Sequence, residues 1–273
     1  MTVMTRTRFD VVPLSQHIGA EIRGLDLREK PDDETVRAIY RAWLDHLVIV
    51  FPDQKLSQED LIRATGYFGE LGELSRPPKY FPKGYSSLLP GIMLISNIRE
   101  NGEPIGALPD GEMMFHHDMI HAEVPSKATL LYSVEIPSAG GNTLFASGYA
   151  AYDTLDAAVR DRLEGRKAMH HYNYGSTQKG DNRGTVAFAE CTHPVFRTHE
   201  DSGRKAVYVN RLMTWASSTC RRRKASRCST PCSTTRRNAS SSTSTSGAWA
   251  ICCSGTIAAP RTRAPISPRA SAG

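Results

Sequence analysis

The side chains best suited to chemistry in this chain lie in residues 115–118, which read Phe-His-His-Asp. On a β-strand, residues two apart point to the same face, so His116 and Asp118 would project together and His117 would point away. One imidazole and one carboxylate are two of the three ligands of a 2-His-1-carboxylate triad, which leaves open positions on non-haem Fe(II). The pair predicts part of an iron site, whose third ligand must be a distant histidine.

A His-x-Asp pair by itself is a weak signal, because most such pairs are surface residues or members of a satisfied polar network. Its context strengthens the hypothesis: the Pro- and Gly-rich residues 76–110 precede it, and a tight turn over residues 137–143 follows. Thr143 would place a hydroxyl at the start of a strand, where it can donate to a carboxylate near the metal. The alternative is that Thr143 is simply a β-branched residue entering a strand.

The other histidines near this segment have simpler interpretations. His117 and His121 can line the site, although packing or solvent exposure is the favoured interpretation for both. We interpret His170, His171 and His193 as structural.

The elements that would position these residues follow from apolar periodicity and turn signals. Capping groups at residues 31–34 open a helix with one apolar face, and Ser57-x-x-Asp60 opens a second helix that runs to about Phe68. Residues 149–163 indicate helical turns. Strands are expected at residues 47–51, 92–96, 128–134, 193–197 and 206–209. Short strands with a few helices near the N-terminus indicate a mainly β core with helical decoration, in the α+β class.

The composition changes abruptly at Trp215. The last 59 residues contain no Asp, Glu, His, Leu, Val, Phe, Tyr or Met, but they hold 21 Ser or Thr and five of the six cysteines. Residues 1–214 carry 24 basic and 28 acidic side chains, so the net charge of +6 comes from the tail. The two parts therefore do not follow one folding pattern.

Cysteine use and the absence of targeting patterns indicate the compartment. Only Cys191 lies before the tail, as in a reduced protein, and the tail cysteines have no zinc-type spacing. No signal-peptide pattern is present, and no apolar run approaches the roughly 18 residues that span a bilayer. We expect a cytoplasmic protein with no membrane partner.

Several segments of residues 1–214 together resemble the Fe(II)/2-oxoglutarate-dependent dioxygenases related to taurine dioxygenase and 2,4-dichlorophenoxyacetate dioxygenase. The matching segments are residues 18–27, 46–54, 68–71, 115–118, 137–147 and 193–210. The resemblance implies a double-stranded β-helix (jelly-roll) core, Fe(II) bound by His116 and Asp118, and 2-oxoglutarate contacted by Thr143. It also implies O2 as co-substrate, a hydroxylated small organic substrate, and succinate and CO2 as co-products.

Substrate recognition is less defined by the resemblance. By its position before the metal segment, Asn97 is a candidate to face the substrate. Residues 74–78 read Leu-Ser-Arg-Pro-Pro where the taurine enzyme has histidine-containing sequence, so taurine itself is not the expected substrate.

The family also requires a distal histidine and an arginine about ten residues later, which would clamp the far carboxylate of 2-oxoglutarate. Both belong after Asn210, and the sequence has no histidine there. We therefore divide the chain into residues 1–214, an incomplete dioxygenase jelly-roll domain, and residues 215–273, an aberrant low-complexity tail expected to be disordered. The C-terminal strands are expected to be missing or replaced, and the chain as written is expected to be inactive.

The genetic code offers an explanation for the tail. When codons 244–266 are read one base upstream, Trp249-Ala250 encodes Gly, Ile251-Cys252 encodes Leu or Met, and Cys252-Cys253 encodes Leu. The remaining codons permit a segment similar to the family's distal-histidine region. This pattern indicates that the reading frame was lost near residues 213–216.

A non-catalytic protein is the alternative from a different class: a cupin-like remnant whose basic tail binds nucleic acid. The tail lacks the alternating aromatic residues of a single-strand binder. We favour the enzyme, with a small-molecule substrate and no nucleic-acid or membrane partner, and we leave open whether it forms a homo-oligomer.

Sequencing the gene across codons 205–273 tests the frame interpretation. We expect the codons of Arg261 and Thr262 to read as histidine in the upstream frame, because the family requires its distal ligand there. Codons that cannot encode histidine in that frame would rule the interpretation out without any protein chemistry.

Overall fold

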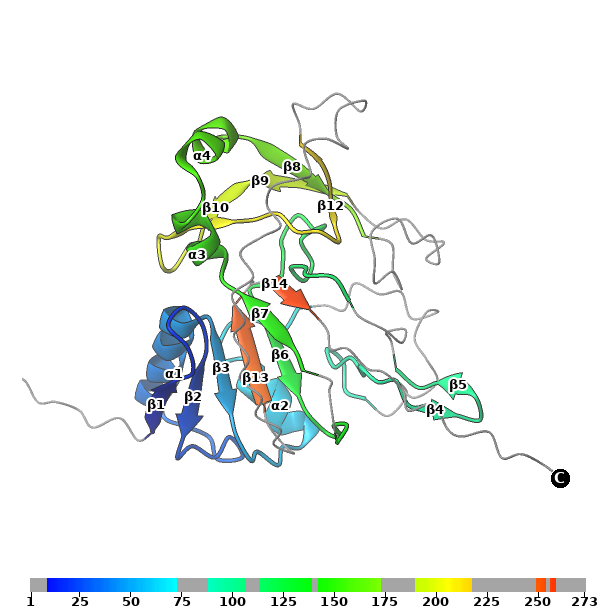
Figure 1. Ribbon diagram of the computed structural model, residues 1–273. Coiled ribbons are helices and arrows are strands. Elements are labelled where there is room, and N and C mark those ends of the chain that lie inside the picture. The colour runs from blue at the N-terminus through cyan, green and yellow to red at the C-terminus, as the bar shows by residue number, and fades with distance from the viewer. Residues whose placement is uncertain are drawn as a thin grey trace, which may run out of the picture.

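The computed structural model describes residues 9–72, 88–106, 113–138, 142–172, 190–217, 249–253 and 256–258. Its strands form two main groups, one above the other in Figure 1. The larger sheet lies with α1 and α2 at one end of the molecule. A smaller sheet lies with α3 and α4 at the other end.

The larger sheet has five strands in the order β1-β2-β3-β13-β6. They are β1 (Asp10–Pro13), β2 (Ala20–Arg23), β3 (Val48–Phe51), β13 (Trp249–Cys253) and β6 (Ala128–Tyr132). β1 and β2 form an antiparallel hairpin, and β2 runs parallel to β3. β13 is antiparallel to both of its neighbours, so a strand from the tail joins β3 to β6.

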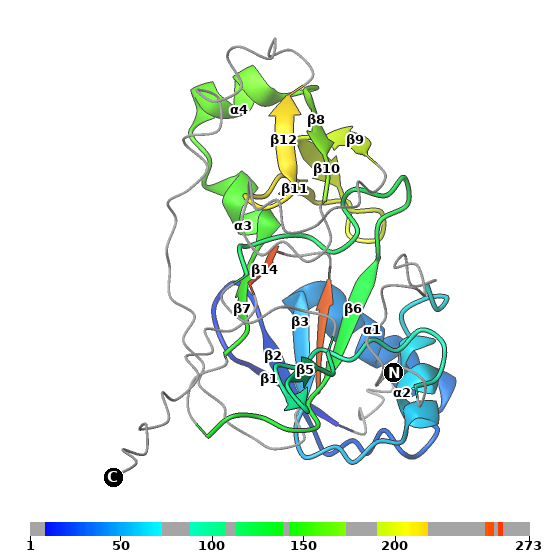
Figure 2. The ribbon, with the colours of Figure 1, turned by 90° about the vertical axis from the view of Figure 1, so that its right-hand side faces the viewer.

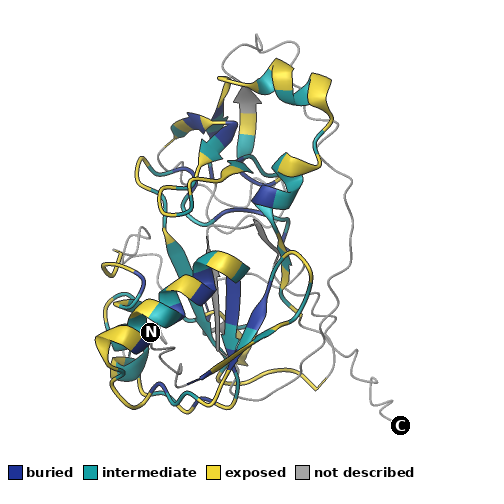
Figure 3. Cartoon of the chain, turned by 90° about the vertical axis from the view of Figure 1, so that its left-hand side faces the viewer, coloured by how far each residue is buried: buried dark blue, intermediate teal, exposed yellow. Residues whose placement is uncertain are grey.

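Helix α1 (Asp33–His46) covers one face of this sheet. Its N-cap residue is Asp32, whose side chain accepts a hydrogen bond from the backbone N–H of Thr35. Its C-cap residue is Leu47, whose positive φ of 66° turns the chain directly into β3. Figure 3 shows exposed residues on the outer face of α1 and buried residues on the side that faces the sheet.

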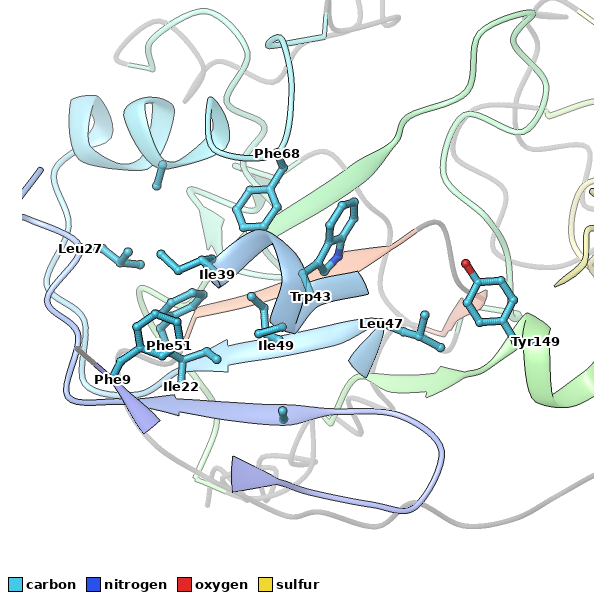
Figure 4. Close-up of a cluster of buried hydrophobic side chains, with 13 residues drawn as sticks. Phe9, Ile22, Leu27, Ile39, Trp43, Leu47, Ile49, Phe51, Phe68 and Tyr149 are labelled. Atoms are coloured by element: carbon cyan, nitrogen blue, oxygen red, sulfur yellow. The ribbon is translucent and has the colours of Figure 1, made fainter. Parts of the chain in front are cut away.

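The main hydrophobic core lies between α1, α2 (Gln58–Thr65) and the larger sheet (Figure 4). The Trp43 and Phe68 rings meet edge to face with centroids 5.3 Å apart. Buried Gln54 donates to the Leu25 carbonyl and accepts from the Leu27 backbone N–H, so its amide satisfies the loop that follows β2. Ser57 and Asp60 form the expected capping box of α2.

The second group of elements is built around a three-stranded sheet in the order β12-β8-β9. Its strands are β12 (Thr214–Ser217), β8 (Lys167–His170) and β9 (Cys191–Pro194), and the hairpin β10 (Phe196–Thr198) and β11 (Lys205–Val207) follows β9. Helices α3 (Gly148–Asp153) and α4 (Ala157–Leu163) belong to this part of the chain, and α3 contacts β11. Two short pairs complete the strands: β7 (Leu144–Ala146) with β14 (Thr256–Ala258), and β4 (Arg99–Glu100) with β5 (Glu103–Pro104) (Figure 2).

A polar junction joins the two groups. Asp201, in the turn between β10 and β11, accepts a 2.9 Å hydrogen bond from the Tyr40 hydroxyl and pairs with Lys127 at 3.1 Å. Tyr40 lies on α1, and Lys127 immediately precedes β6. The start of β6 is therefore tied both to the helix and to the second group.

Most of the expected elements are present, with two corrections before the tail. Residues 92–96 are not a strand, and the chain forms the small β4–β5 hairpin after them instead. His116 is a single bridge residue followed by a turn, not part of a continuous strand. The expected loop at residues 76–110 lies partly outside the described residues.

The tail needs a further correction. We expected residues 215–273 to be disordered, but residues 249–253 and 256–258 form strands, and β12 continues past the proposed boundary to Ser217. β13 fills a place in the larger sheet, so that position is occupied by a tail segment. Residues 218–248, 254–255 and 259–273 lie outside the described residues. Among the described helices, none is both long and apolar enough to cross a bilayer.

Deleting residues 249–258 should destabilise the chain, because it leaves the facing edges of β3 and β6 without their partner strand. We expect a lower thermal midpoint and more light scattering on heating. A deletion of equal length at residues 225–234 is the matched control. Equal effects of the two deletions would contradict a structural role for β13.

Candidate metal centre

His116 and Asp118 lie together in the structure. His116 Nε2 is 3.3 Å from Asp118 Oδ1. The His116 side chain is 8% exposed and that of Asp118 is 33% exposed, so the pair is sheltered but still reachable from solvent. The approach that we expected from strand alternation is reached instead through a bridge residue and a turn.

Each member of the pair is held by a hydrogen bond on its other polar atom. The Nδ1–H of His116 donates to the Met114 carbonyl at 2.8 Å, so Nε2 is the ring nitrogen that faces Asp118. Asp118 Oδ2 accepts a 2.6 Å hydrogen bond from the hydroxyl of Thr129 on β6. His116 Nε2 and Asp118 Oδ1 are thus the two atoms available to one cation.

Each residue of the pair favours the charged form of the other. Burial disfavours the charged forms of both groups, but the neighbouring Asp118 holds the pKa of His116 above its usual value. The pKa of Asp118 lies below its usual value, because hydrogen bonds from His116 and Thr129 outweigh the effect of burial. The carboxylate is therefore ionised near neutral pH, as a metal ligand must be.

His117 points into the protein, as its place between the two candidate ligands predicts. It is 1% exposed, and its ring lies 4.9 Å from that of Tyr208. Asn210 Nδ2 donates to His117 Nδ1 at 3.3 Å. Burial, followed by the neighbouring imidazoles of His116 and His170, lowers the pKa of His117 to about 3, so the ring is neutral.

The polar contacts of His117 continue to the smaller sheet. The backbone N–H of Asn210 donates to Thr214 Oγ1 at 2.9 Å, and Thr214 Oγ1 lies 3.1 Å from His170 Nδ1. The His170 ring is 5.7 Å from that of His193, whose Nε2 donates to the Ala122 carbonyl at 2.9 Å. His170 and His193 thus pack and hydrogen-bond within the fold, in line with the structural role that we expected.

The remaining candidate residues are less closely placed. Thr143 is half-buried and immediately precedes β7, which is the strand-start position that we expected. Asn97 is exposed in the segment before β4. No hydrogen bond that the structure gives joins either of them to His116 or Asp118, so their roles stay predictions. His121 is buried, and its ring lies 5.8 Å from that of Tyr172.

Sequence reasoning missed the hydroxyl that contacts the carboxylate. Thr129 donates to Asp118, a contact separate from the role toward 2-oxoglutarate that is expected for Thr143. Thr129 stands in an apolar strand without a motif around it, so its sequence carried no signal of this contact. Asn210, which contacts His117, lies at the end of residues 193–210, a segment that resembles the dioxygenase family. That position was the signal in the sequence that could have pointed to it.

The donor set fits part of a metal site. An imidazole nitrogen that loses its proton on metal binding and an ionised carboxylate oxygen, each residue oriented by a second hydrogen bond, are suitable ligands for Fe(II). Within the described ranges, no group of three or more His, Cys, Asp or Glu side chains is placed to hold a metal ion. The described site therefore supplies two ligands.

A profile of the taurine catabolism dioxygenase TauD, TfdA family matches residues 10–224. The chain belongs to this family. The matching range includes His116, Asp118, Thr129 and Thr143. It also extends across the proposed domain boundary and past the end of β12 to residue 224.

Named relatives of the TauD/TfdA family share the same part of the chain. The pentalenolactone F synthase of Streptomyces avermitilis is 34% identical over 216 residues, which cover 72% of this chain and 69% of that protein. The (S)-phenoxypropionate/alpha-ketoglutarate-dioxygenase of Sphingobium herbicidovorans is 28% identical over 214 residues, which cover 74% of this chain and 71% of that protein. The second of these relatives is by its name an alpha-ketoglutarate-dioxygenase that acts on (S)-phenoxypropionate.

A solved structure extends the likeness to the fold. The structure of AAD-2 in complex with Mn(II) and N-oxalylglycine superposes with a TM-score of 0.65 at 20% identity, covering 96% of this chain and 94% of that one. The two chains therefore share a fold.

The buried imidazole of His170 should make folding sensitive to acid. Burial, followed by the nearby imidazoles of His193 and His121, lowers its pKa from 6.5 to about 4. Between these values the unfolded chain binds a proton that the folded chain does not. Stability should therefore fall as the pH drops from about 6.5 to 4, by about 1.4 kcal/mol per pH unit from this group.

Urea unfolding of the parent and of His170→Gln at pH 7 and pH 5 measures this contribution. We expect a smaller loss of stability at pH 5 in the variant, because glutamine does not titrate. His17→Gln, which changes an exposed histidine, should behave as the parent does. Equal losses in the parent and His170→Gln would show that His170 does not carry the effect.

Proposed function

We propose that the gene encodes an Fe(II)- and 2-oxoglutarate-dependent dioxygenase that hydroxylates a small organic substrate, with succinate and CO2 as co-products. The observation that carries the proposal is the 3.3 Å approach of His116 Nε2 and Asp118 Oδ1, with each residue's other polar atom already hydrogen-bonded. Membership of the TauD/TfdA family supports the same reaction class.

In this proposal His116 and Asp118 hold Fe(II), and the bound ion would supply the activation of O2. Mn(II) in the AAD-2 structure supports a divalent metal in this fold. Thr143 would donate its hydroxyl to 2-oxoglutarate, which suits its half-buried position at the start of β7. Asn97, which is exposed and precedes β4, would contact the substrate.

The substrate class is proposed from the relatives. Phenoxypropionate, which the name of the Sphingobium herbicidovorans relative gives as its substrate, is a small carboxylic acid with an aromatic ring. The name of the pentalenolactone F synthase gives its product, pentalenolactone F. A small organic molecule with apolar surface suits both. We also propose a cytoplasmic location, from the low cysteine content of residues 1–214.

We further propose that the chain as written does not turn over. Its sequence has no histidine after His199 and therefore no distal ligand at the position that the family uses. A two-ligand site would hold Fe(II) weakly, and the missing arginine removes the charge partner of 2-oxoglutarate. Because the metal ligands and the arginine act together in catalysis, we expect their loss to abolish the activity and not merely to reduce it.

The test compares succinate formation by the chain as written with that of a version whose frame is restored near codon 214. Both receive Fe(II), ascorbate, 2-oxoglutarate and O2. We expect succinate from the restored protein alone, and none after His116→Ala or Asp118→Ala in that protein. His17→Ala, at an exposed site, is the control that should retain activity.

Two results would contradict the proposal. Equal succinate from both versions would refute the need for the restored segment. Parent-like turnover by either ligand variant would refute the metal assignment.

A further inference from the structure

We propose that Thr129 is the positioning residue of the candidate metal centre: its hydroxyl binds one carboxylate oxygen of Asp118 and so presents the other oxygen to the cation. This inference rests on the metal site of the proposed function. It concerns a residue that lies eleven positions after Asp118, on a different element, and that no motif identifies.

The need for such a residue follows from where the ligands lie. Asp118 begins a turn, and a turn by itself does not hold a side chain in one orientation. The two oxygens of a free carboxylate can exchange by rotation about the last side-chain bond. The 2.6 Å hydrogen bond from Thr129 distinguishes them, because Oδ2 is committed to the hydroxyl while Oδ1 lies 3.3 Å from His116 Nε2.

Thr129 can do this because β6 is fixed on both sides of it. Two residues before it, Lys127 pairs with Asp201 at 3.1 Å, and its ammonium lies 5.2 Å from the centroid of the Tyr40 ring. Three residues after it, the Tyr132 hydroxyl accepts from the Leu56 backbone N–H at 3.0 Å. A hydroxyl on a strand that is anchored in this way gives the ligand a rigid support.

Asp118 is oriented in the same way as the other candidate ligand, His116. His116 is oriented through Nδ1 by the Met114 carbonyl, and Asp118 is oriented through Oδ2 by Thr129. Outer hydrogen bonds of this kind fix ligand orientation, and removing one typically weakens metal binding about 10–100-fold. The Met114 contact is a backbone carbonyl, so among these two supports only Thr129 can be removed by substitution.

The test titrates the full chain with Co(II) alone, under anaerobic conditions, and follows the visible absorption of the bound ion. Thr129→Val removes the hydroxyl and keeps a β-branched side chain of the same size for the strand. Thr129→Ser restores the hydroxyl. Thr65→Val is the matched control, because it removes a half-buried threonine hydroxyl that donates to the Leu61 carbonyl in α2.

We expect Thr129→Val to bind Co(II) about 10–100-fold more weakly, with an altered absorption spectrum, whereas Thr129→Ser and Thr65→Val bind as the parent does. The spectrum reports the ligand geometry directly, which a loss of stability elsewhere would not change. Thermal unfolding of each variant accompanies the titration. If Thr129→Val does not fold, Thr129→Ala takes its place in the comparison with Thr129→Ser.

Parent-like affinity and spectrum in Thr129→Val would overturn the proposal, and so would a Thr129→Ser variant as weak as Thr129→Val. Failure of the metal site itself has a different signature. If His116→Ala binds Co(II) as the parent does, the ligand assignment is wrong, and the role of Thr129 falls with it.

Discussion

The hydrogen bond between Thr129 and Asp118 joins the larger sheet to the segment that carries both candidate ligands. This segment has no strand ladder of its own beyond the single bridge at His116, so its geometry depends on contacts from other elements. The larger sheet supplies the hydroxyl that orients Asp118. The core packed around Trp43 and Ile39 in turn holds that sheet against α1 (Figure 4).

From the other side, the same segment is held by buried polar side chains. Hydrogen bonds join His117 to Asn210, Asn210 to Thr214, and Thr214 to His170 on β8. Such a network specifies one arrangement of the surrounding backbone but requires neutral imidazoles, because burying a charge without a partner is costly. The candidate centre therefore lies between a rigid sheet on one side and an acid-sensitive polar layer on the other.

The tail contributes to both sheets. β12 begins at Thr214, the last residue before the tail, and continues into the tail to Ser217, and β13 pairs along the whole of β6. Sequence composition separates residues 215–273 from the rest of the chain, yet these two strands attach that part to both sheets. The unusual composition of the tail does not prevent these segments from pairing, because backbone hydrogen bonds between strands do not require the residue types that a domain core does.

The sequence by itself determined the local elements and the candidate ligand pair. Capping residues and apolar periodicity placed α1 and α2, because these signals act between residues a few positions apart. The spacing of His116 and Asp118 also predicted that their side chains lie together, although the segment is a bridge and a turn and not the strand that we expected. Family membership followed from segments spread over residues 10–224.

Only the tertiary structure decided which side chains support that pair. Thr129 lies within β6 and Thr143 immediately precedes β7, and no local pattern marks either one as a partner of Asp118. The contact of Thr129 with Asp118 is set by how β6 packs beside the metal segment. The fate of His117 and His170 was likewise decided by burial between distant elements, which lowers their pKa values to about 3 and about 4. Contacts between residues far apart in the chain depend on the whole packing arrangement, and short sequence patterns do not record it.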